Sequence, residues 1–263
     1  GGGLPRPPAL PKYYPSGRTQ VTRHEPPFEV IAHGPGWMLV EKPSGITIHN
    51  DPGRDLSSQL AGYLQTYDMM GLDPQFGLHA VHRLDRETSG LVLLAGRHDV
   101  FEFLSEQFAE GLVQKKYLAV VHGTVPITPG DQWQQWTQPL ARKAGGRSHI
   151  QGKGKRVACT TRFRALRHSR HYTLLICILV TGRMHQIRRH AALAGHPILG
   201  DLRYGSKRAC RYLAEKYQFT RLALHASSLS VRTPEAPRPR RFESFQFPPE
   251  LQRLIDEDGC ARL

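Results

Sequence analysis

Cysteine is scarce in this sequence, with four residues in a chain of 263. Cys159, Cys177, Cys210 and Cys260 lie far apart, and no pair has the Cys-X-X-Cys spacing that is typical of structural zinc sites. Small secreted domains that depend on disulfides carry many more cysteines for their length. We therefore exclude a disulfide-stabilised scaffold and a cysteine-based zinc site, and expect a protein that works with reduced thiols.

Long apolar runs are also missing. The longest, Leu174 to Val180, is far shorter than the roughly 20 residues that a helix needs to cross a bilayer. The opening Gly1-Gly2-Gly3 is not followed by the apolar segment of a secretory signal. These absences favour a cytoplasmic protein without a membrane partner.

Acidic residues are absent from a long interval of the chain. Between Asp131 and Asp201 there is no Asp or Glu, whereas 13 Lys or Arg occur there. The whole chain has 36 Lys or Arg against 22 Asp or Glu, which gives a formal net charge of +14. Such an excess favours a polyanionic partner, and nucleic acid is the obvious candidate. The alternative is a basic face that only meets solvent.

Histidine is plentiful, but it forms no clear metal-binding pattern. Zinc ligands usually come as two pairs, each with members three to five positions apart. Among His82, His185, His190 and His225, only His185 with His190 approaches such a pair. Arginines stand beside both and would oppose a cation. We therefore predict no metal site, and interpret these histidines as hydrogen-bonding scaffold or nucleic-acid contacts.

Proline is concentrated at the beginning of the chain. Seven of the first 27 residues are Pro, and four more are Lys or Arg. This composition is typical of an extended or disordered arm. We therefore predict an arm over residues 1–27 and a single folded domain over residues 28–263, with no internal repeat and no separate RNA-binding module ahead of it.

From residue 28 onward the sequence alternates between two kinds of pattern. Branched or alternating runs predict strands, and apolar residues three or four positions apart predict helices. No strand-helix-strand rhythm repeats, which favours an α+β fold over a doubly wound one. The predicted strands are 28–32, 37–41, 79–84, 91–95, 117–121, 159–166, 172–180 and 222–231. The predicted helices contain Leu56, Leu60 and Leu64, run from Val100 past Phe108 to near Gly111, and cover 184–193, 207–217 and 249–256.

An aspartate between two arginines follows the third predicted strand. The run His82-Arg83-Leu84-Asp85-Arg86 places Asp85 on a loop between two strands, where a rigid scaffold often presents functional side chains. Taken alone, the commoner explanation is structural, because such an Asp can pair with Arg83 or Arg86, or cap the next element.

Four segments of the chain together resemble one family. The run from Val81 to Leu91 is similar to the active-site motif of the RluA-type RNA pseudouridine synthases, in which the Asp of His-Arg-Leu-Asp is catalytic. Val40 to Gly45, Gln114 to Val120, and Thr181 to Asp201 resemble further family segments and occur in the family's order. The resemblance extends from about residue 28 to the end of the chain.

This resemblance implies a fold, an activity and a partner. The fold would be α+β, with a central, mostly antiparallel mixed sheet, flanking helices and a catalytic cleft across the sheet. The activity would be isomerisation of uridine in RNA to pseudouridine, with ribosomal RNA slightly favoured over transfer RNA as the target. No cofactor or metal would be needed, because the product is an isomer of the substrate. Nothing indicates an obligate protein partner, and a monomer is expected.

The resemblance also assigns roles to individual residues. Asp85 would attack or deprotonate the ribose, Arg188 would keep Asp85 ionised, and Tyr117 would stack on the uracil and assist proton removal. Arg83 would fill the space left when the target base flips out. The other predicted substrate contacts are His82, Arg183, His185 and Gln186.

Two positions depart from the family pattern, and two rival functions remain. Met184 stands where small polar residues are frequent, and Arg189 where an apolar residue is usual; Arg189 is interpreted as an added phosphate contact. A non-catalytic RNA-binding or ribosome-assembly protein would explain the charge equally well, and a metal-dependent nuclease is a third alternative. Retention of Asp85, Tyr117 and Arg188 favours the enzyme.

Overall fold

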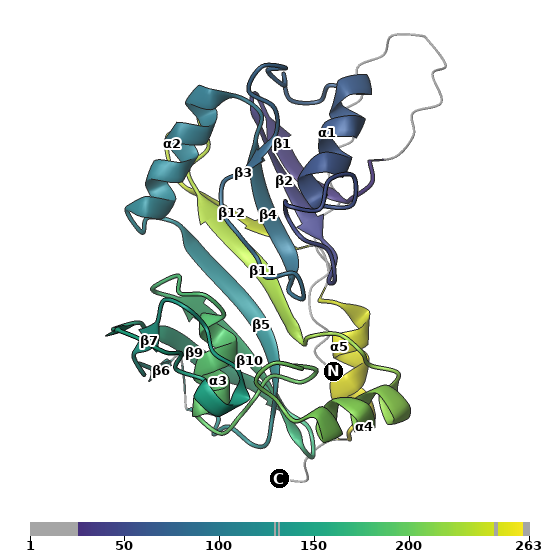
Figure 1. Cartoon of the computed structure of the whole chain (residues 1–263), viewed down its shortest axis with the longest axis vertical. Coiled ribbons are helices and arrows are strands. Elements are labelled where there is room, and N and C mark those ends of the chain that lie inside the picture. Colours follow the sequence, from purple (N-terminus) through teal and green to yellow (C-terminus); the bar gives the residue numbers. More distant parts are fainter. Residues whose placement is uncertain (1–25, 129, 131, 245–246, 260–263) are drawn as a thin grey trace.

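A large twisted sheet forms the centre of the molecule (Figure 1). The computed structural model describes residues 26–128, 130, 132–244 and 247–259, so the predicted arm lies almost wholly outside the described residues. Eight strands of the sheet follow the order β1-β2-β4-β11-β5-β10-β9-β6, while β3 pairs with β4 and β12 with β11. These strands are β1 (Val30–Gly34), β2 (Trp37–Lys42), β3 (His79–Ala80), β4 (Ser89–Ala95), β5 (Gln114–His122), β6 (Gln134–Trp136), β9 (Thr161–His168), β10 (Tyr172–Leu179), β11 (Leu224–Val231) and β12 (Arg240–Glu243).

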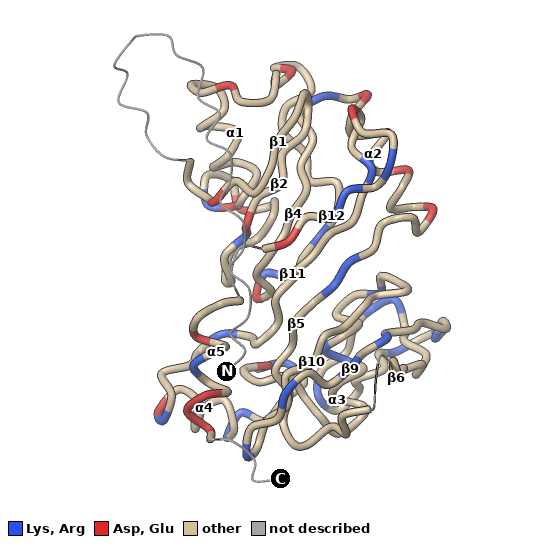
Figure 2. The backbone as a smooth tube through the Cα atoms, turned by 180° about the vertical axis from the view of Figure 1, so that it is seen from behind, with Lys and Arg blue, Asp and Glu red and all other residues tan. Residues whose placement is uncertain are grey.

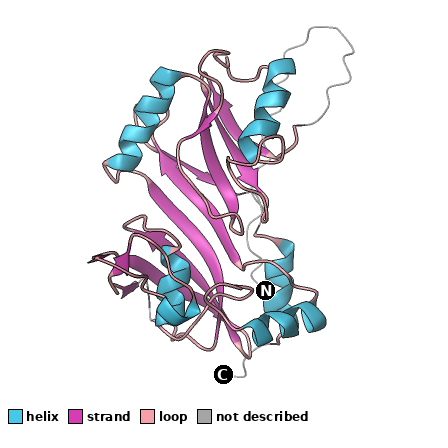
Figure 3. Cartoon of the chain, in the orientation of Figure 1, coloured by secondary structure: helices cyan, strands magenta, loops and turns pink. Residues whose placement is uncertain are grey.

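The helices lie around this sheet (Figure 3). In the described residues, β4 and β11 form its one parallel pair, and the other neighbours run antiparallel. The expected α+β fold with a mostly antiparallel mixed sheet is therefore confirmed. The helices are α1 (Leu56–Thr66), α2 (His98–Ala109), α3 (Gln186–Leu193), α4 (Lys207–Tyr217) and α5 (Pro249–Glu257). A small second sheet joins β7 (Leu140–Ala141) to β8 (Arg156–Val157).

Two apolar clusters hold the helices to the sheet. The larger contains buried side chains of α1, α3, α4 and α5, and the smaller contains those of α2. In α1, Leu56, Leu60 and Leu64 are at most 1% exposed, as their spacing of four residues predicts. The Asp55 carboxylate accepts a hydrogen bond from the Ser58 amide at 2.8 Å, which caps the start of this helix.

Several predicted boundaries were wrong around the functional motifs. The strand predicted over 79–84 ends at Ala80, and the chain then forms an irregular loop up to β4. The helix predicted from Met184 begins at Gln186, because His185 is in the left-handed region with φ of 52°. Both differences lengthen the loops that carry the motifs, so Asp85 and His185 lie on irregular backbone.

Some short strands were not predicted at all. β6, β7 and β8 have two or three residues each, which is too few for an alternating pattern to show. β6 is held instead by packing, since the rings of Trp136 and Phe163 stack with centroids 4.0 Å apart. In the described part of the chain no helix combines the length and the apolar character required to cross a bilayer.

Candidate active site

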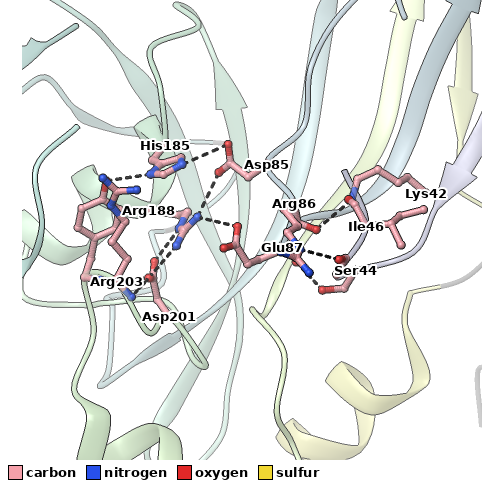
Figure 4. Close-up of polar contacts among 12 residues, drawn as sticks. Lys42, Ser44, Ile46, Asp85, Arg86, Glu87, His185, Arg188, Asp201 and Arg203 are labelled. Carbon is pink, nitrogen blue, oxygen red and sulfur yellow. Dashed lines mark hydrogen bonds and ion pairs between the residues drawn. The ribbon is translucent and has the colours of Figure 1, made fainter. Parts of the chain in front are cut away.

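Asp85 lies on the loop between β3 and β4, with its side chain 26% exposed. One carboxylate oxygen is 3.4 Å from Nη1 of Arg188, and the other is 3.6 Å from Nε2 of His185. Figure 4 shows both side chains reaching Asp85 from the same side. The motif taken alone allowed Arg83 or Arg86 as the partner of Asp85, whereas the resemblance implied Arg188. The ionic contact in the structure is to Arg188.

Arg188 is fixed mainly by a residue to which the sequence gave no role. It is 3% exposed, and its Nε and Nη2 donate to the two carboxylate oxygens of Asp201 at 2.8 and 2.9 Å. Its Nη1 remains for Asp85 and for Glu87, which lies 3.3 Å away. Burial lowers the pKa of Arg188, but the hydrogen bonds and charge of Asp201 outweigh burial and raise it overall. The guanidinium is therefore a permanent cation with a fixed orientation.

His185 is held beside Asp85 by a tyrosine. Its Nδ1 lies 2.9 Å from the Tyr204 hydroxyl, while Nε2 faces the carboxylate of Asp85. Burial lowers the pKa of His185, and the negative charge of Asp85 opposes this effect. The left-handed backbone of His185 places its ring over the pocket.

Tyr117 reaches the same pocket from the middle of the sheet. It belongs to β5, is 5% exposed, and lines a cavity of about 100 Å³ with Asp85 and Arg188. Burial first, and then the charge of Asp85, raise the pKa of the Tyr117 phenol far above its usual value. The hydroxyl is therefore protonated at neutral pH.

Most of the predicted site residues converge on this small cavity. Its lining includes Arg83, Asp85, Tyr117, Arg183, His185, Gln186 and Arg188. A wider cavity of about 710 Å³ opens above it, shares Arg83, Asp85, Arg183 and His185, and adds Arg142 and Arg203. These two cavities lie where the resemblance placed a cleft.

His82 and Gln186 do not have the positions expected of substrate contacts. His82 is absent from the lining of both cavities: its ring stacks on Phe108, and its Nε2 accepts a hydrogen bond from the Leu93 amide at 3.0 Å. Gln186 does line the small cavity, but its amide group is used by the turn before α3. It bonds to Thr181 Oγ1, the Arg183 amide, the Thr160 carbonyl and Thr161 Oγ1. We therefore reassign both residues to positioning the backbone.

Arg189 was interpreted as a phosphate contact, and this interpretation was wrong. Its side chain is 0% exposed, and its guanidinium donates four hydrogen bonds to backbone carbonyls. A buried cation whose donors are used in this way has no route to an RNA phosphate. Its neighbour Arg188 points to the active site because successive residues of a helix face different directions.

Lys42 is a residue whose importance the sequence did not reveal. It ends β2, is 0% exposed, and its Nζ donates to the carbonyls of Pro43, Ile46 and Arg86 at 2.9 to 3.1 Å. Burial lowers the pKa of Lys42 to about 8, although Asp85 partly opposes this. Because Arg86 follows Asp85, Lys42 joins the Lys-Pro turn to the loop of Asp85, as Figure 4 shows. Three apolar residues before this lysine, in Met38 to Val40, were the available signal that it is buried.

The described residues contain no group of three or more His, Cys, Asp or Glu side chains arranged to hold a metal ion. His185 and His190 are separated by their partners: His185 faces Asp85 and Tyr204, whereas Nδ1 of His190 lies 2.9 Å from Thr161 Oγ1. The chemistry that this site offers is therefore that of an aspartate, a buried phenol and fixed cations.

Residues 36–193, more than half of the chain, match the sequence model of a family described as RNA pseudouridylate synthase. The chain belongs to this family. The matched range includes Asp85, Tyr117 and Arg188, whereas Asp201 lies beyond it.

Curated relatives in this family carry names that refer to the large ribosomal subunit. The chain is 34% identical over 216 residues to ribosomal large subunit pseudouridine synthase C of Escherichia coli strain K12, which covers 79% of this chain and 63% of that protein. It is 32% identical over 238 residues to ribosomal large subunit pseudouridine synthase D of Zymomonas mobilis, covering 87% and 72%. The chain thus spans less than two thirds of the length of the first of these relatives.

Solved structures of family members share the fold. The structure of human RNA pseudouridylate synthase domain containing 4 aligns with a TM-score of 0.65 and 22% identity, over 86% of this chain and 92% of that chain. Human RNA pseudouridylate synthase domain containing 1 aligns with a TM-score of 0.63 and 21% identity, over 90% and 98%. The pseudouridine synthase fold expected from the motifs is therefore confirmed.

Proposed function

We propose that this protein isomerises uridine in RNA to pseudouridine, with ribosomal RNA as the substrate. The observation that carries the proposal is the meeting of Asp85, Tyr117 and Arg188 in one small cavity, although the three come from three separate segments of the chain. The names of the curated relatives support ribosomal RNA over transfer RNA. The protein is proposed to act in the cytoplasm as a monomer.

The reaction replaces the bond between the ribose and N1 of uracil by a bond between the ribose and C5. The bond from C1′ to N1 of uracil breaks, the uracil turns within the pocket, and C1′ is rejoined to C5. Carbon 5 then loses its proton and N1 gains one, so the product has the composition of the substrate and no cofactor is consumed. Asp85 either attacks C1′, forming and later losing an ester bond, or removes the C2′ proton to give a glycal.

Arg188 supports either course by keeping Asp85 ionised. A fixed guanidinium 3.4 Å from the carboxylate favours its charged form. Since Asp201 fixes the other side of the same guanidinium, Arg188 does not need to reorganise during the reaction. Both the nucleophile and the base require this charged state of Asp85.

Tyr117 is proposed to hold the uracil between cleavage of its bond to the ribose and formation of the new one. Its ring offers a flat apolar surface on which a uracil can stack, and its hydroxyl is in a position to relay the C5 proton. Because a stacked nucleotide hides C1′, the target must first flip out of the RNA at a cost of a few kcal/mol. Arg83 is exposed at the entrance of the cavity and is proposed to occupy the space that the base leaves.

Replacement of Asp85 by Asn tests this function directly. The amide is similar in size but is neither nucleophile nor base, so formation of pseudouridine in a transcript of large-subunit ribosomal RNA should fall below detection by chemical labelling specific for pseudouridine. RNA affinity should change less than about threefold, because Asp85 makes no favourable phosphate contact. Appreciable turnover by Asp85→Asn would remove Asp85 from the chemistry. A wild-type protein that binds this RNA without modifying it would favour the non-catalytic RNA-binding protein.

A further inference from the structure

A basic loop over residues 141–152 forms one side of the wider cavity. It runs from β7 through the short turn at Arg147–His149, and it contains no acidic residue. Its side chains Arg142, Lys143 and Arg147 are exposed. A loop of this kind has few ladder hydrogen bonds of its own, so other groups must satisfy its backbone carbonyls if it is to keep one shape.

The buried Arg189 provides most of these partners. Its guanidinium donates to the carbonyls of Ala141, Ile150 and Gln151 at 2.5 to 3.1 Å, and to that of Met184 at 3.2 Å. One planar group thus joins the two ends of the basic loop to the turn that precedes α3. Since the next residue on α3, Arg188, contacts Asp85, the loop is tied to the element that orients the catalytic aspartate.

Arg203 holds the middle of the same loop. Its Nε and Nη2 donate to the carbonyls of Gly145 and Ala144 at 3.0 and 3.1 Å, and Figure 4 shows it beside Asp201 and the His185 side of the site. Gly152 closes the loop with φ of +79°, and a Cβ there would lie 2.2 Å from the Lys143 carbonyl oxygen. Arg189 and Arg203 therefore hold the loop, and Gly152 is required where the chain comes back close to Lys143.

The result of this arrangement is the position of Arg142. It directly follows Ala141, whose carbonyl accepts a hydrogen bond from Arg189, and it lines the wider cavity together with Thr47 to Asn50. Five arginines line this cavity: Arg83, Arg86, Arg142, Arg183 and Arg203. The acidic side chains in its lining are Asp85 and Glu87 at its floor, of which both contact Arg188.

The geometry points to a phosphate-binding site at the mouth of the active-site cavity, in which Arg142 binds the RNA backbone next to the target uridine and Arg189 acts as a positioning residue for Arg142. This inference rests on the proposed function, since it assumes that RNA enters by this cavity. Guanidinium groups suit phosphate oxygens because their donors form a planar fork. The hydrogen bonds of Arg189 to residues 141, 150, 151 and 184, here called the Arg189 clamp, set the distance between the phosphate site and Asp85. Binding of the RNA backbone at that site therefore places the uridine over the Asp85 carboxylate.

Arg142→Gln tests the phosphate site. With poly(U) as the binding probe, affinity should fall about tenfold and the slope of log affinity against log salt should lose about one unit. The matched control is Arg170→Gln, which removes the same charge from an exposed position outside both cavities. Equal effects of the two variants would overturn the site.

A double-mutant cycle tests the clamp. Arg189→Met frees the loop, so it should weaken poly(U) binding about as much as Arg142→Gln, and the double variant should be no weaker than about tenfold overall. A hundredfold loss, the product of independent effects, would mean that Arg189 does not act through Arg142. If Arg189→Met fails to fold, Gly152→Ala displaces the loop by another route and should show the same non-additivity. These readouts measure binding, so they remain interpretable if Asp85→Asn shows that the proposed chemistry is wrong.

Discussion

The two walls of the active-site cavity are held by the same physical device, but only one of them carries acidic residues. The catalytic wall, residues 42–46 and 83–87, carries Asp85 and Glu87 and is held by Lys42, whose ammonium donates to three carbonyls. The basic wall, residues 141–152 and 183–189, has no acidic residue and is held by Arg189, which donates to four. In both, a buried cation replaces the hydrogen-bond ladder that a loop lacks.

The difference between the two cations fits what each wall must hold. The three carbonyls on Lys42 converge on one atom, so a compact ammonium is sufficient, and the pKa of Lys42 falls to about 8 because the group is desolvated. The carbonyls bound by Arg189 lie on separate stretches of the loop. A planar guanidinium has donors that reach all of them, whereas a single ammonium would not. Further Lys and Arg residues lie along β5 and β12 (Figure 2).

Tyr117 lines the small cavity with residues of both walls, and its replacement should have the largest effect on turnover after that of Asp85. Tyr117→Phe keeps the ring and loses the hydroxyl, so kcat should fall about 100-fold while RNA affinity is unchanged. Tyr117→Ala also loses stacking and should be slower by about a further tenfold. Single-turnover rates and poly(U) binding separate the two effects. Tyr172→Phe, a buried tyrosine on β10 outside both cavities, is the control. If Tyr117→Ala retained more activity than Tyr117→Phe, stacking would be ruled out.

Lys42→Met should distinguish the roles of the two walls, because it disturbs only the catalytic wall. Three carbonyls lose their donor, so the free energy of unfolding should fall by about 2 to 4 kcal/mol and turnover by about 10- to 100-fold. Poly(U) affinity should stay close to wild type, because the basic wall is untouched. Urea unfolding and single-turnover kinetics measure both changes. Lys116→Met, on the neighbouring surface of β5, should change neither, and a large loss of RNA affinity in Lys42→Met would show that the walls are not independent.

His82 precedes the catalytic wall but is proposed to serve packing alone, and its effect should be the smallest. Burial, and then the charge of Lys115, lower the pKa of His82 to about 3, whereas an unfolded histidine titrates near pH 6.5. Below about pH 6.5 the unfolded chain therefore binds a proton that the folded chain does not, so this contribution to stability is complete above that pH and is lost as the pH falls toward 3.

The measurement is the free energy of unfolding of His82→Gln at about pH 7 and about pH 5.5. The acid-induced loss should be smaller in this variant than in wild type by about 1 kcal/mol, and RNA affinity should not change. His79→Gln alters an exposed histidine and should leave the loss as it is in wild type. An identical pH dependence of His82→Gln and wild type would contradict the buried, neutral state of His82.

The order of the motifs along the sequence was enough to predict the fold and to select Asp85, Tyr117 and Arg188, which line one cavity, as the proposed catalytic trio. It did not identify the residues that support them. Asp85, Tyr117 and Arg188 were predicted because each has a side-chain type that the chemistry needs within a recognisable segment. Lys42, Glu87 and Asp201 were given no role, since a Lys-Pro turn or a lone carboxylate has no local signature of its long-range partner. For the same reason His82 and Arg189 were placed in contact with RNA, although both are turned into the protein.

Local sequence therefore determined the elements whose patterns are short-range: the leucines of α1, the branched strands, the helix over 207–217, and the interval without acidic residues that forms the basic wall. Tertiary structure alone decided which charged groups face the cavity and which are buried. Two adjacent arginines illustrate this, because Arg188 contacts Asp85 and Arg189 holds the loop of Arg142. Their residue type is identical, and what separates them is the direction in which each leaves the helix and the groups that it meets there.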